Sequence, residues 1–185
     1  MGRLKQQLLE VPSSGWKQSR VACHRGRMLP GVDIPDRGAR FRMRGAVEGD
    51  LLDIARLDGE VFPATPYPFF VLRQLFAMGC VPLVVEDGER ICAYVLSSGQ
   101  DGARCWILAL AVAPDARARG LGRGLMRETL YELRRRGVRE VLLSVEPANS
   151  AAIALYRSLG FTCDEALRRD YFGPGEDRLI MRSRL

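Results

Sequence analysis

Arginines and glycines alternate over residues 117–124, RARGLGRG, between an apolar run that ends at Val112 and an amphipathic stretch. We expect a buried strand, a turn, and a loop that opens a helix. Glycines at a helix start let the backbone approach a ligand, and the first N–H groups of a helix lack partners inside it. The helix dipole favours negative charge there. The stretch is therefore a candidate phosphate or pyrophosphate cradle; the alternative is a glycine-rich turn with its arginines in solvent.

Two well-known phosphate cradles do not fit the spacing of these glycines. A P-loop requires GxxxxGK[ST], and neither Lys-Ser nor Lys-Thr follows the glycines in this chain. Gly120, Gly122 and Gly124 fall at GxGxG, whereas the dinucleotide fingerprint is GxGxxG. The acidic residue that the fingerprint expects about 20 residues further on is also missing, since position 142 is Leu. The pattern that remains is R-x-x-G-x-G.

This pattern resembles the acyl-CoA pyrophosphate loop of the GNAT superfamily of N-acetyltransferases. A second stretch, NSAAIALYRSLGF at residues 149–161, resembles the superfamily signature N-x-x-A-x-x-L-Y-x-x-x-G-F. The resemblance is closest to the bacterial ribosomal-protein-alanine N-acetyltransferases and extends to the tail, RRDYF at 168–172 and EDRLIM at 176–181. It covers residues 41–185, and its two motifs occur in the right order and separation.

The resemblance implies that acetyl-CoA is the acetyl donor and that no metal is needed. The strand before the glycine loop would hold the pantetheine and the thioester, although its side chains look like plain core. Asn149 matches an asparagine that contacts CoA, and it also suits a helix N-cap. The residues implied for acetyl-CoA binding are Leu110, Ala111, Val112, Arg117, Ala118, Arg119, Gly120, Leu121, Gly122, Arg123, Asn149 and Tyr156.

Tyr156 matches the tyrosine that acts as general acid for the CoA thiolate in this superfamily. A free tyrosine has a pKa of about 10 and a thiol of about 8.5, so a protonated tyrosine is a plausible donor. A core tyrosine packed on Leu159 is the alternative. Ser144 stands where the subfamily has a glutamate base, and serine cannot take a proton from an ammonium. Glu146, two residues on, is either a water-mediated base or a surface charge.

The acceptor side of the site is expected at the proline-rich loop FPATPYP, residues 62–68. It is similar to the F-P-x-x-Y loop with which N-terminal acetyltransferases grip a peptide, although one extra residue separates Pro63 from Tyr67. A rigid loop packed on the core is the alternative. The acceptor residues implied by the resemblance are Phe62, Pro63, Tyr67 and, as a weaker candidate, Tyr171.

The elements that must position these residues follow the order β-α-α-β-β-β-α-β-α-β-β. We expect a mixed α/β sheet of about seven strands with helices on both faces, which is also the order of the GNAT fold. Helices are expected after Asp50 as N-cap, over Phe69–Met78, after the glycine loop up to Gly137, and after Asn149. The expected strands are Phe41–Ala46 at an edge, Val81–Glu86, Arg90–Ser97, Cys105–Val112 buried on both faces, Val141–Val145, Phe161–Ala166 and Arg178–Arg182.

Composition bounds the class of protein. The chain has 185 residues, is 47% hydrophobic and carries a net charge of +6. Residues 1–40 hold eight Lys and Arg against three Asp and Glu, so we expect a basic, weakly ordered extension before a domain at 41–185. Contact of this extension with nucleic acid or a ribosome is less favoured than a plain tail, and the nearly neutral remainder argues against a nucleic-acid-binding domain. Neither a signal peptide nor a membrane span is expected.

Five scattered cysteines and a single histidine favour neither a disulfide framework nor a metal site, and they suit a reducing cytoplasm. Three functions then compete. The first is acetyl transfer by direct attack, in a ternary complex, of a protein N-terminal α-amine. The second is the same chemistry on a small amine such as a polyamine, amino acid or antibiotic, for which Asp58 and Glu60 offer little acidic charge. The third is a non-catalytic acyl-CoA-binding module. The acceptor, the base and the oligomeric state stay open.

Overall fold

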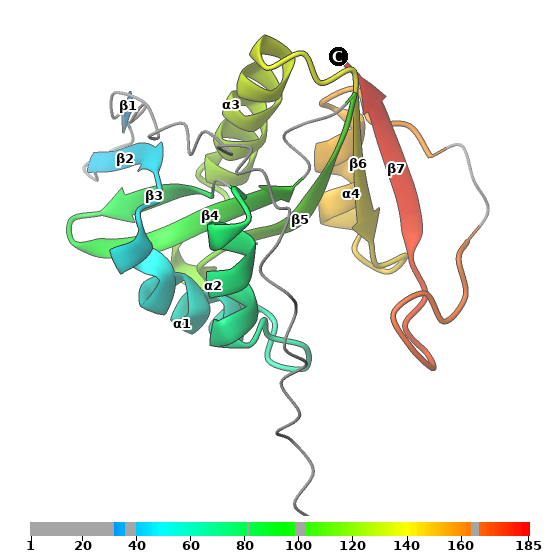
Figure 1. Cartoon of the computed structure of the whole chain (residues 1–185), viewed down its shortest axis with the longest axis horizontal. Helices are drawn as coiled ribbons and strands as arrows, with labels where there is room; N and C mark the ends of the chain where they lie inside the picture. The colour runs from blue at the N-terminus through cyan, green and yellow to red at the C-terminus, as the bar shows by residue number, and fades with distance from the viewer. Residues whose placement is uncertain (1–31, 36–39, 81, 99–102, 164–166) are drawn as a thin grey trace, which may run out of the picture.

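The described residues form one mixed sheet of seven strands, whose spatial order is the order along the chain (Figure 1). The computed structural model describes residues 32–35, 40–80, 82–98, 103–163 and 167–185. Neighbouring strands are antiparallel except for β5 and β6, which are parallel. The strands are β1 Val32–Pro35, β2 Arg40–Gly45, β3 Leu83–Asp87, β4 Arg90–Ser98, β5 Arg104–Val112, β6 Glu140–Val145 and β7 Leu179–Arg184.

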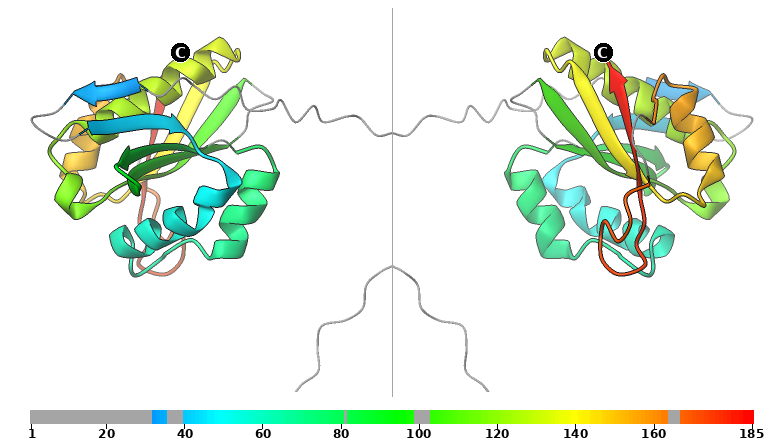
Figure 2. Two further views of the ribbon diagram at one scale, coloured as in Figure 1. Left: turned by 90° about the vertical axis from the view of Figure 1, so that its left-hand side faces the viewer. Right: turned by 90° about the vertical axis from the view of Figure 1, so that its right-hand side faces the viewer.

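Helices cover both faces of this sheet, as the sequence predicts: α1 and α2 lie on one face, and α3 and α4 on the other (Figure 2). None of the helices within the described residues combines the length and the apolar character that crossing a bilayer requires. The helices are α1 Leu51–Val61, α2 Phe69–Ala77, α3 Leu121–Arg135 and α4 Ser150–Arg157, with short 3-10 turns at Glu48–Asp50 and Pro114–Ala116.

The strand buried on both faces is β4, not β5. Seven consecutive residues of β4, from Ile91 to Ser97, are buried between the two helical layers. We expected this burial for Cys105–Val112, because that run is the most apolar in the chain. In β5 full burial is confined to Cys105, Ile107 and Ala111, and the remaining apolar residues are partly exposed. The expectation was wrong because apolar content does not say whether an element of the chain covers both faces of a strand.

The amino-terminal side of the sheet extends further than expected. β2 was predicted to be an edge strand, but it pairs with β1 on one side and β3 on the other. β1 precedes Arg40, so the sheet includes residues assigned to the extension. Residues 1–31 lie outside the described part of the chain, and the domain boundary stays a prediction.

The strand predicted over Phe161–Ala166 is not one of the seven. Thr162 forms an isolated bridge with Arg182 of β7, and residues 164–166 lie outside the described part of the chain. The strand predicted over Arg178–Arg182 is β7, which pairs along its full length with β6. The sequence of residues 161–166 does not indicate how many of them bond to a neighbouring strand.

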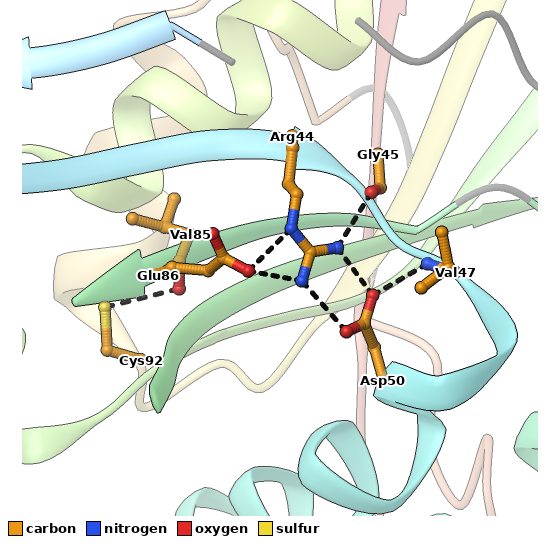
Figure 3. A network of polar contacts seen from close by, with 7 residues as sticks. All are labelled: Arg44, Gly45, Val47, Asp50, Val85, Glu86 and Cys92. Atoms are coloured by element: carbon orange, nitrogen blue, oxygen red, sulfur yellow. Dashed lines mark hydrogen bonds and ion pairs between the residues drawn. The ribbon is translucent and has the colours of Figure 1, made fainter. Parts of the chain in front are cut away.

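An ion-pair network fixes the corner between β2 and α1 (Figure 3). The Arg44 guanidinium bonds to Asp50 at 2.6 Å and 2.9 Å and to Glu86 of β3 through Nε at 2.6 Å. Asp50 also accepts the Val47 N–H at 2.7 Å, so its carboxylate does not cap α1 as predicted. Burial raises the pKa of Asp50, but these hydrogen bonds outweigh it and hold the pKa below its usual value. The network thus links β2, β3 and the residue before α1.

Candidate active site

The site is built on an opening between β5 and β6. The parallel ladder joins Arg104–Ile107 to Glu140–Leu143 and then stops, although β5 continues to Val112 and β6 to Val145. A register shift in the pairing of β5 with β4 lies next to this point. Figure 1 shows the two strands diverging. Backbone groups of residues 108–112 that face away from β4 are therefore not bonded to β6 and can bind another molecule.

The glycine loop lies directly beyond the open end of β5 and forms the start of α3. The Gly124 N–H donates to the Gly120 carbonyl at 2.9 Å and is the first helical donor, so the N–H groups of residues 121–123 have no acceptor inside the helix. Gly120 has φ +77° and Ala118 has φ +61°, both in the left-handed region. These two reversals turn the chain out of the strand and aim the helix start at the opening. The loop has the geometry of an anion cradle.

The three arginines predicted to add charge to this cradle have different surroundings. Arg117 donates through Nε to the Val112 carbonyl at 3.2 Å, which ties the loop back to the end of β5. The guanidinium carbon of Arg119 lies 5.5 Å from the centre of the Phe41 ring, over its face. Arg123 is exposed on the first turn of α3. The structure therefore brings the loop, the strand end and the helix start together. Of these three arginines, Arg123 alone makes no hydrogen bond, ion pair or ring contact with the described residues.

Three elements converge beneath Gly122. A Cβ built at Gly122 would lie 3.6 Å from Val112 Cγ2, 3.7 Å from Leu155 Cδ2 and 3.8 Å from Leu110 Cδ2. The first turn of α3, the end of β5 and α4 are thus in van der Waals contact. Leu110 and Val112 were predicted at the donor site and lie at this junction. Leu155 was not predicted there, yet it is the residue through which α4 meets the start of α3.

Asn149 and Tyr156 mark the two ends of α4. The Asn149 side chain accepts the Ala152 N–H at 3.0 Å and caps the helix, as predicted. The Tyr156 ring is buried, with its centroid 5.9 Å from that of Phe161. Burial raises the pKa of Tyr156 to about 12. Tyr156 therefore keeps its phenolic proton over the whole physiological range, as a proton donor must.

Ser144, which replaces the glutamate of the subfamily, and the candidate base Glu146 lie at the end of β6. Ser144 is half-buried in the strand, opposite Ile180 of β7. Glu146 follows the end of the strand and is exposed, and its carbonyl accepts the Asn149 N–H at 3.0 Å. Glu146 is thus at the mouth of the opening, and the assignment as base stays a prediction.

The acceptor loop reaches the opening from the opposite face of the sheet. Tyr67 donates from its hydroxyl to the Leu108 carbonyl at 3.4 Å, at the point where β5 leaves β6. Phe62 is the C-cap of α1 and half-buried, whereas Pro63 is exposed. Tyr171 is exposed in the segment before β7, where its ring lies 4.9 Å from that of Phe172. The structure therefore places Tyr67 at the opening, while the contacts of Tyr171 do not connect it with that loop.

A buried carboxylate anchors this loop, and the sequence did not reveal its role. Asp58 of α1 is fully buried and accepts the Tyr67 backbone N–H at 2.5 Å and the hydroxyl of Tyr94 from β4. Burial, and then the nearby Asp58, raises the pKa of both tyrosines, so both remain protonated donors. The helical spacing could have revealed its burial, because Asp58 follows Leu51 and Ile54 on the buried side of α1. Because its oxygens are occupied inside the protein, Asp58 does not offer acidic charge to a small cationic acceptor.

Comparison with known proteins connects this geometry to one family. Residues 50–161, more than half of the chain, match the acetyltransferase (GNAT) family. The ribosomal protein bS18-alanine N-acetyltransferase of Escherichia coli (strain K12) is 45% identical over 75 residues, which are 39% of this chain and 50% of that enzyme. The match therefore spans half the length of that relative.

Two further similarities bear on the acceptor and on the fold. A mycothiol acetyltransferase of Geodermatophilus obscurus is 50% identical over 82 residues, 41% of this chain and 27% of that protein. The crystal structure of the ribosomal-protein-S18-alanine N-acetyltransferase from Escherichia coli has a TM-score of 0.70 at 27% identity, covering 78% of this chain and 93% of that one. The chain is thus similar over part of its length to acetyltransferases with different names.

Proposed function

This chain belongs to the acetyltransferase (GNAT) family, and we propose that it transfers the acetyl group of acetyl-CoA to the N-terminal α-amine of a protein. One observation carries the proposal. The β5–β6 ladder stops at Ile107, the unpaired part of β5 runs on to Val112 ahead of the glycine loop, and Tyr156 is buried on α4. Open strand backbone, an anion cradle and a protonated phenol are the three parts that acetyl transfer from a thioester requires.

The residues present suit acetyl-CoA as donor. The N–H groups at the start of α3 would hold the pyrophosphate, with Arg123 adding charge. The open backbone of residues 110–112 would bind the pantetheine amides and orient the thioester carbonyl. The side chain of Asn149 is exposed at the start of α4. Its NH2 group can donate a hydrogen bond to acetyl-CoA while its oxygen caps the helix.

The amine attacks the acetyl carbon directly, within a complex that holds both substrates. The new C–N bond forms as the carbon–sulfur bond breaks, and the sulfur leaves with the electron pair. Tyr156 gives its phenolic proton to this thiolate, and the proton lost by the amine passes through water to Glu146 or to solvent. Burial raises the pKa of Tyr156 because it disfavours the charged phenolate. It raises the pKa of a CoA thiol beside Tyr156 for the same reason, because the thiolate is also an anion. An α-amine, with a pKa near 8, needs only a weak base.

The pH profile follows from these groups. The rate should rise with pH as the acceptor amine loses its proton, through a pKa of about 8. Burial raises the pKa of Tyr156 to about 12, so Tyr156 stays mostly protonated at pH 10, where an ordinary tyrosine would titrate, and its ionisation does not lower the rate there. We expect kcat/KM, measured from about pH 6 to 11, to reach a plateau. A decline centred near pH 10 would show that Tyr156 is not the buried acid described above.

The acceptor assignment rests on the loop that Asp58 anchors. With asparagine at position 58, an amide NH2 would face either the Tyr67 N–H or the Tyr94 hydroxyl, and one buried donor would lose its acceptor, at a cost of about 1–3 kcal/mol. We expect the Asp58→Asn variant to have a several-fold higher KM for the acceptor peptide, a lower melting temperature and an unchanged Kd for acetyl-CoA.

The matched control for this variant is Asp53→Asn, the same change on the same helix. The Asp53 side chain is half exposed and paired with Arg56 at 3.3 Å, so its loss has little effect. Steady-state kinetics in both substrates, with calorimetry for the donor, separate the two variants. Equal behaviour of Asp58→Asn and Asp53→Asn, or equal changes in both substrates' constants, would remove Asp58 from the acceptor site.

An acceptor screen tests the function itself. We propose to incubate the protein with acetyl-CoA and with N-terminal peptides, polyamines, amino acids or aminoglycosides, and to follow CoA release and product mass. Turnover of peptides is expected. Turnover of small amines alone would favour the second function, and binding of acetyl-CoA without turnover of any acceptor would favour a non-catalytic module.

The scattered cysteines favour the cytoplasm as the location.

A further inference from the structure

The arginines of the domain are concentrated at one end of it. Residues 41–185 hold twenty arginines, no lysine and nineteen acidic residues, so the domain is almost neutral. Seven arginines occupy the start of β5, the end of α3, the start of β6 and the end of β7. We call them the arginine end; they are Arg104, Arg134, Arg135, Arg136, Arg139, Arg182 and Arg184.

Few acidic residues offset these seven charges. Glu132 and Glu140 are the acidic residues of the same segments. Asp101 precedes β5 and lies outside the described residues, and even with it the excess is four positive charges. The rest of the domain then carries a net charge of −3. The near-zero total that argued against nucleic-acid binding thus hides a strong separation of charge.

The arginine end is a compact surface and not a feature of the sequence alone. Glu140 of β6 is paired with Arg104 of β5 and with Arg184 of β7 in the strand register, so the three residues form one row across the sheet. Arg104 Nε lies 2.6 Å from Glu140 Oε2, and Arg182 Nη1 lies 3.8 Å from Glu140 Oε1. Figures 1 and 2 place the loop after α3, the start of β6 and the carboxyl end of the chain together.

A hollow lies within this surface. It is lined by Ala103, Arg104, Arg139, Glu140 and Arg184, so three guanidinium groups surround one carboxylate. The backbone is held firmly, because the Arg139 and Glu140 N–H groups both donate to the Ala103 carbonyl at 2.9 Å. The Leu185 N–H donates to the Arg139 carbonyl at 3.0 Å, which fixes the end of β7 beside it. Rigid backbone keeps the arginines at constant spacing.

The chemistry of the surface favours a phosphate polymer over a protein partner. Protein interfaces have an apolar centre, and among the described residues Tyr131 alone contributes a large exposed apolar side chain to these segments. Arg135 lies 5.8 Å from the Tyr131 ring centre, over its face. Guanidinium groups match phosphate oxygens in pairs. We propose that the arginine end binds the phosphate backbone of a nucleic acid.

This surface is separate from the transfer site. Arg104 and Val112 are eight residues apart on β5, about 26 Å at the rise of a strand. Binding at the arginine end therefore leaves the donor cradle accessible, and the proposal does not depend on acetyl transfer. It differs from contact through residues 1–40, because it lies on the folded domain.

The experiment measures binding of the full chain to a labelled RNA duplex of about 20 base pairs, and to DNA of the same sequence, by fluorescence anisotropy at several salt concentrations. Arg139→Gln/Arg184→Gln removes two exposed arginines of the hollow. We expect about tenfold weaker binding and a slope of log K against log salt that is smaller by about 2, with similar effects for RNA and DNA. Arg139→Lys/Arg184→Lys keeps the charge and should retain most of the affinity.

The control is Arg56→Gln/Arg73→Gln, which changes the net charge equally but on α1 and α2, outside the arginine end. Residues 1–40 are present in every variant, so differences between variants report on the domain. Three results would overturn the proposal. The two glutamine variants could lose equal affinity for RNA, Arg139→Gln/Arg184→Gln could bind RNA as tightly as the wild type, or the lysine variant could bind as weakly as Arg139→Gln/Arg184→Gln. The proposal would also be overturned if the wild-type protein bound neither RNA nor DNA. Displacement of the labelled RNA by polyglutamate as effectively as by unlabelled RNA, at equal charge, would overturn it as well.

Discussion

Replacing Tyr156 by phenylalanine is expected to lower kcat by about 10²- to 10⁴-fold, the range that a positioned general acid contributes. The ring is buried against Phe161, and phenylalanine keeps that packing while it removes the hydroxyl. The fold and the affinity for acetyl-CoA should therefore hardly change. Stopped-flow or steady-state CoA release gives kcat, and calorimetry gives the donor Kd on the same sample.

Phe161→Tyr/Tyr156→Phe is the matched control, because it returns a phenol to the same aromatic pair at the other position. It should not recover activity, since residue 156 lies on α4, whose Leu155 lies beside Gly122 at the start of α3, whereas residue 161 lies beyond the end of α4. A Tyr156→Phe variant with wild-type turnover would remove the general acid. Loss of donor binding together with turnover would instead assign Tyr156 to binding.

Replacing Gly120 by valine should weaken acetyl-CoA binding by at least tenfold. Gly120 has φ +77° at the N-cap of α3, a conformation that costs an L-residue about 1–2 kcal/mol and a β-branched one more. Valine would pull the residue out of the left-handed region and turn the N–H groups of the helix start away from the opening. About 1.4 kcal/mol of lost binding free energy corresponds to the tenfold change.

Gly137→Val separates strain from the loss of the cradle. Gly137 follows the other end of α3 with φ +81°, and a Cβ there would have open space, as at Gly120. Both variants should lose similar unfolding free energy, measured in urea, but only Gly120→Val should lose donor affinity. Gly122→Ala should be tolerated, since its Cβ would make ordinary contacts of 3.6–3.8 Å with Leu110, Val112 and Leu155. Equal donor Kd values for the two valine variants would refute the cradle.

The order of the elements was predictable because local signals mark it clearly. Asp87-Gly88 predicted the β3–β4 hairpin, and Gly88 has φ +63° there. Asn149 predicted the cap of α4, and Gly137 the end of α3. These signals are short-range, so a single sequence contains them. Burial of β5 and the bonding of residues 161–163 depend on neighbours from other parts of the chain, and both expectations failed.

The candidate site divides in the same way. The glycine loop and Tyr156 were found from motifs, because backbone conformation and a titratable group require particular residue types. The end of the β5–β6 ladder at Ile107 has no side-chain signature, and Leu108 contributes through its carbonyl. Asp58 looked like an acceptor-side charge, but the fold buries it against Tyr94. The arginine end was hidden because its residues come from four separate segments.

A single-turnover experiment with labelled acetyl-CoA tests the central claim most directly. The protein is mixed with the labelled donor and a peptide that has a free α-amine and an internal lysine, then quenched at short times and analysed by mass spectrometry. The label should pass to the α-amine with no labelled protein at any time, and Tyr156→Phe should bind the donor without transfer. Label retained on the protein, or found on the lysine alone, would contradict direct transfer to an N-terminal amine.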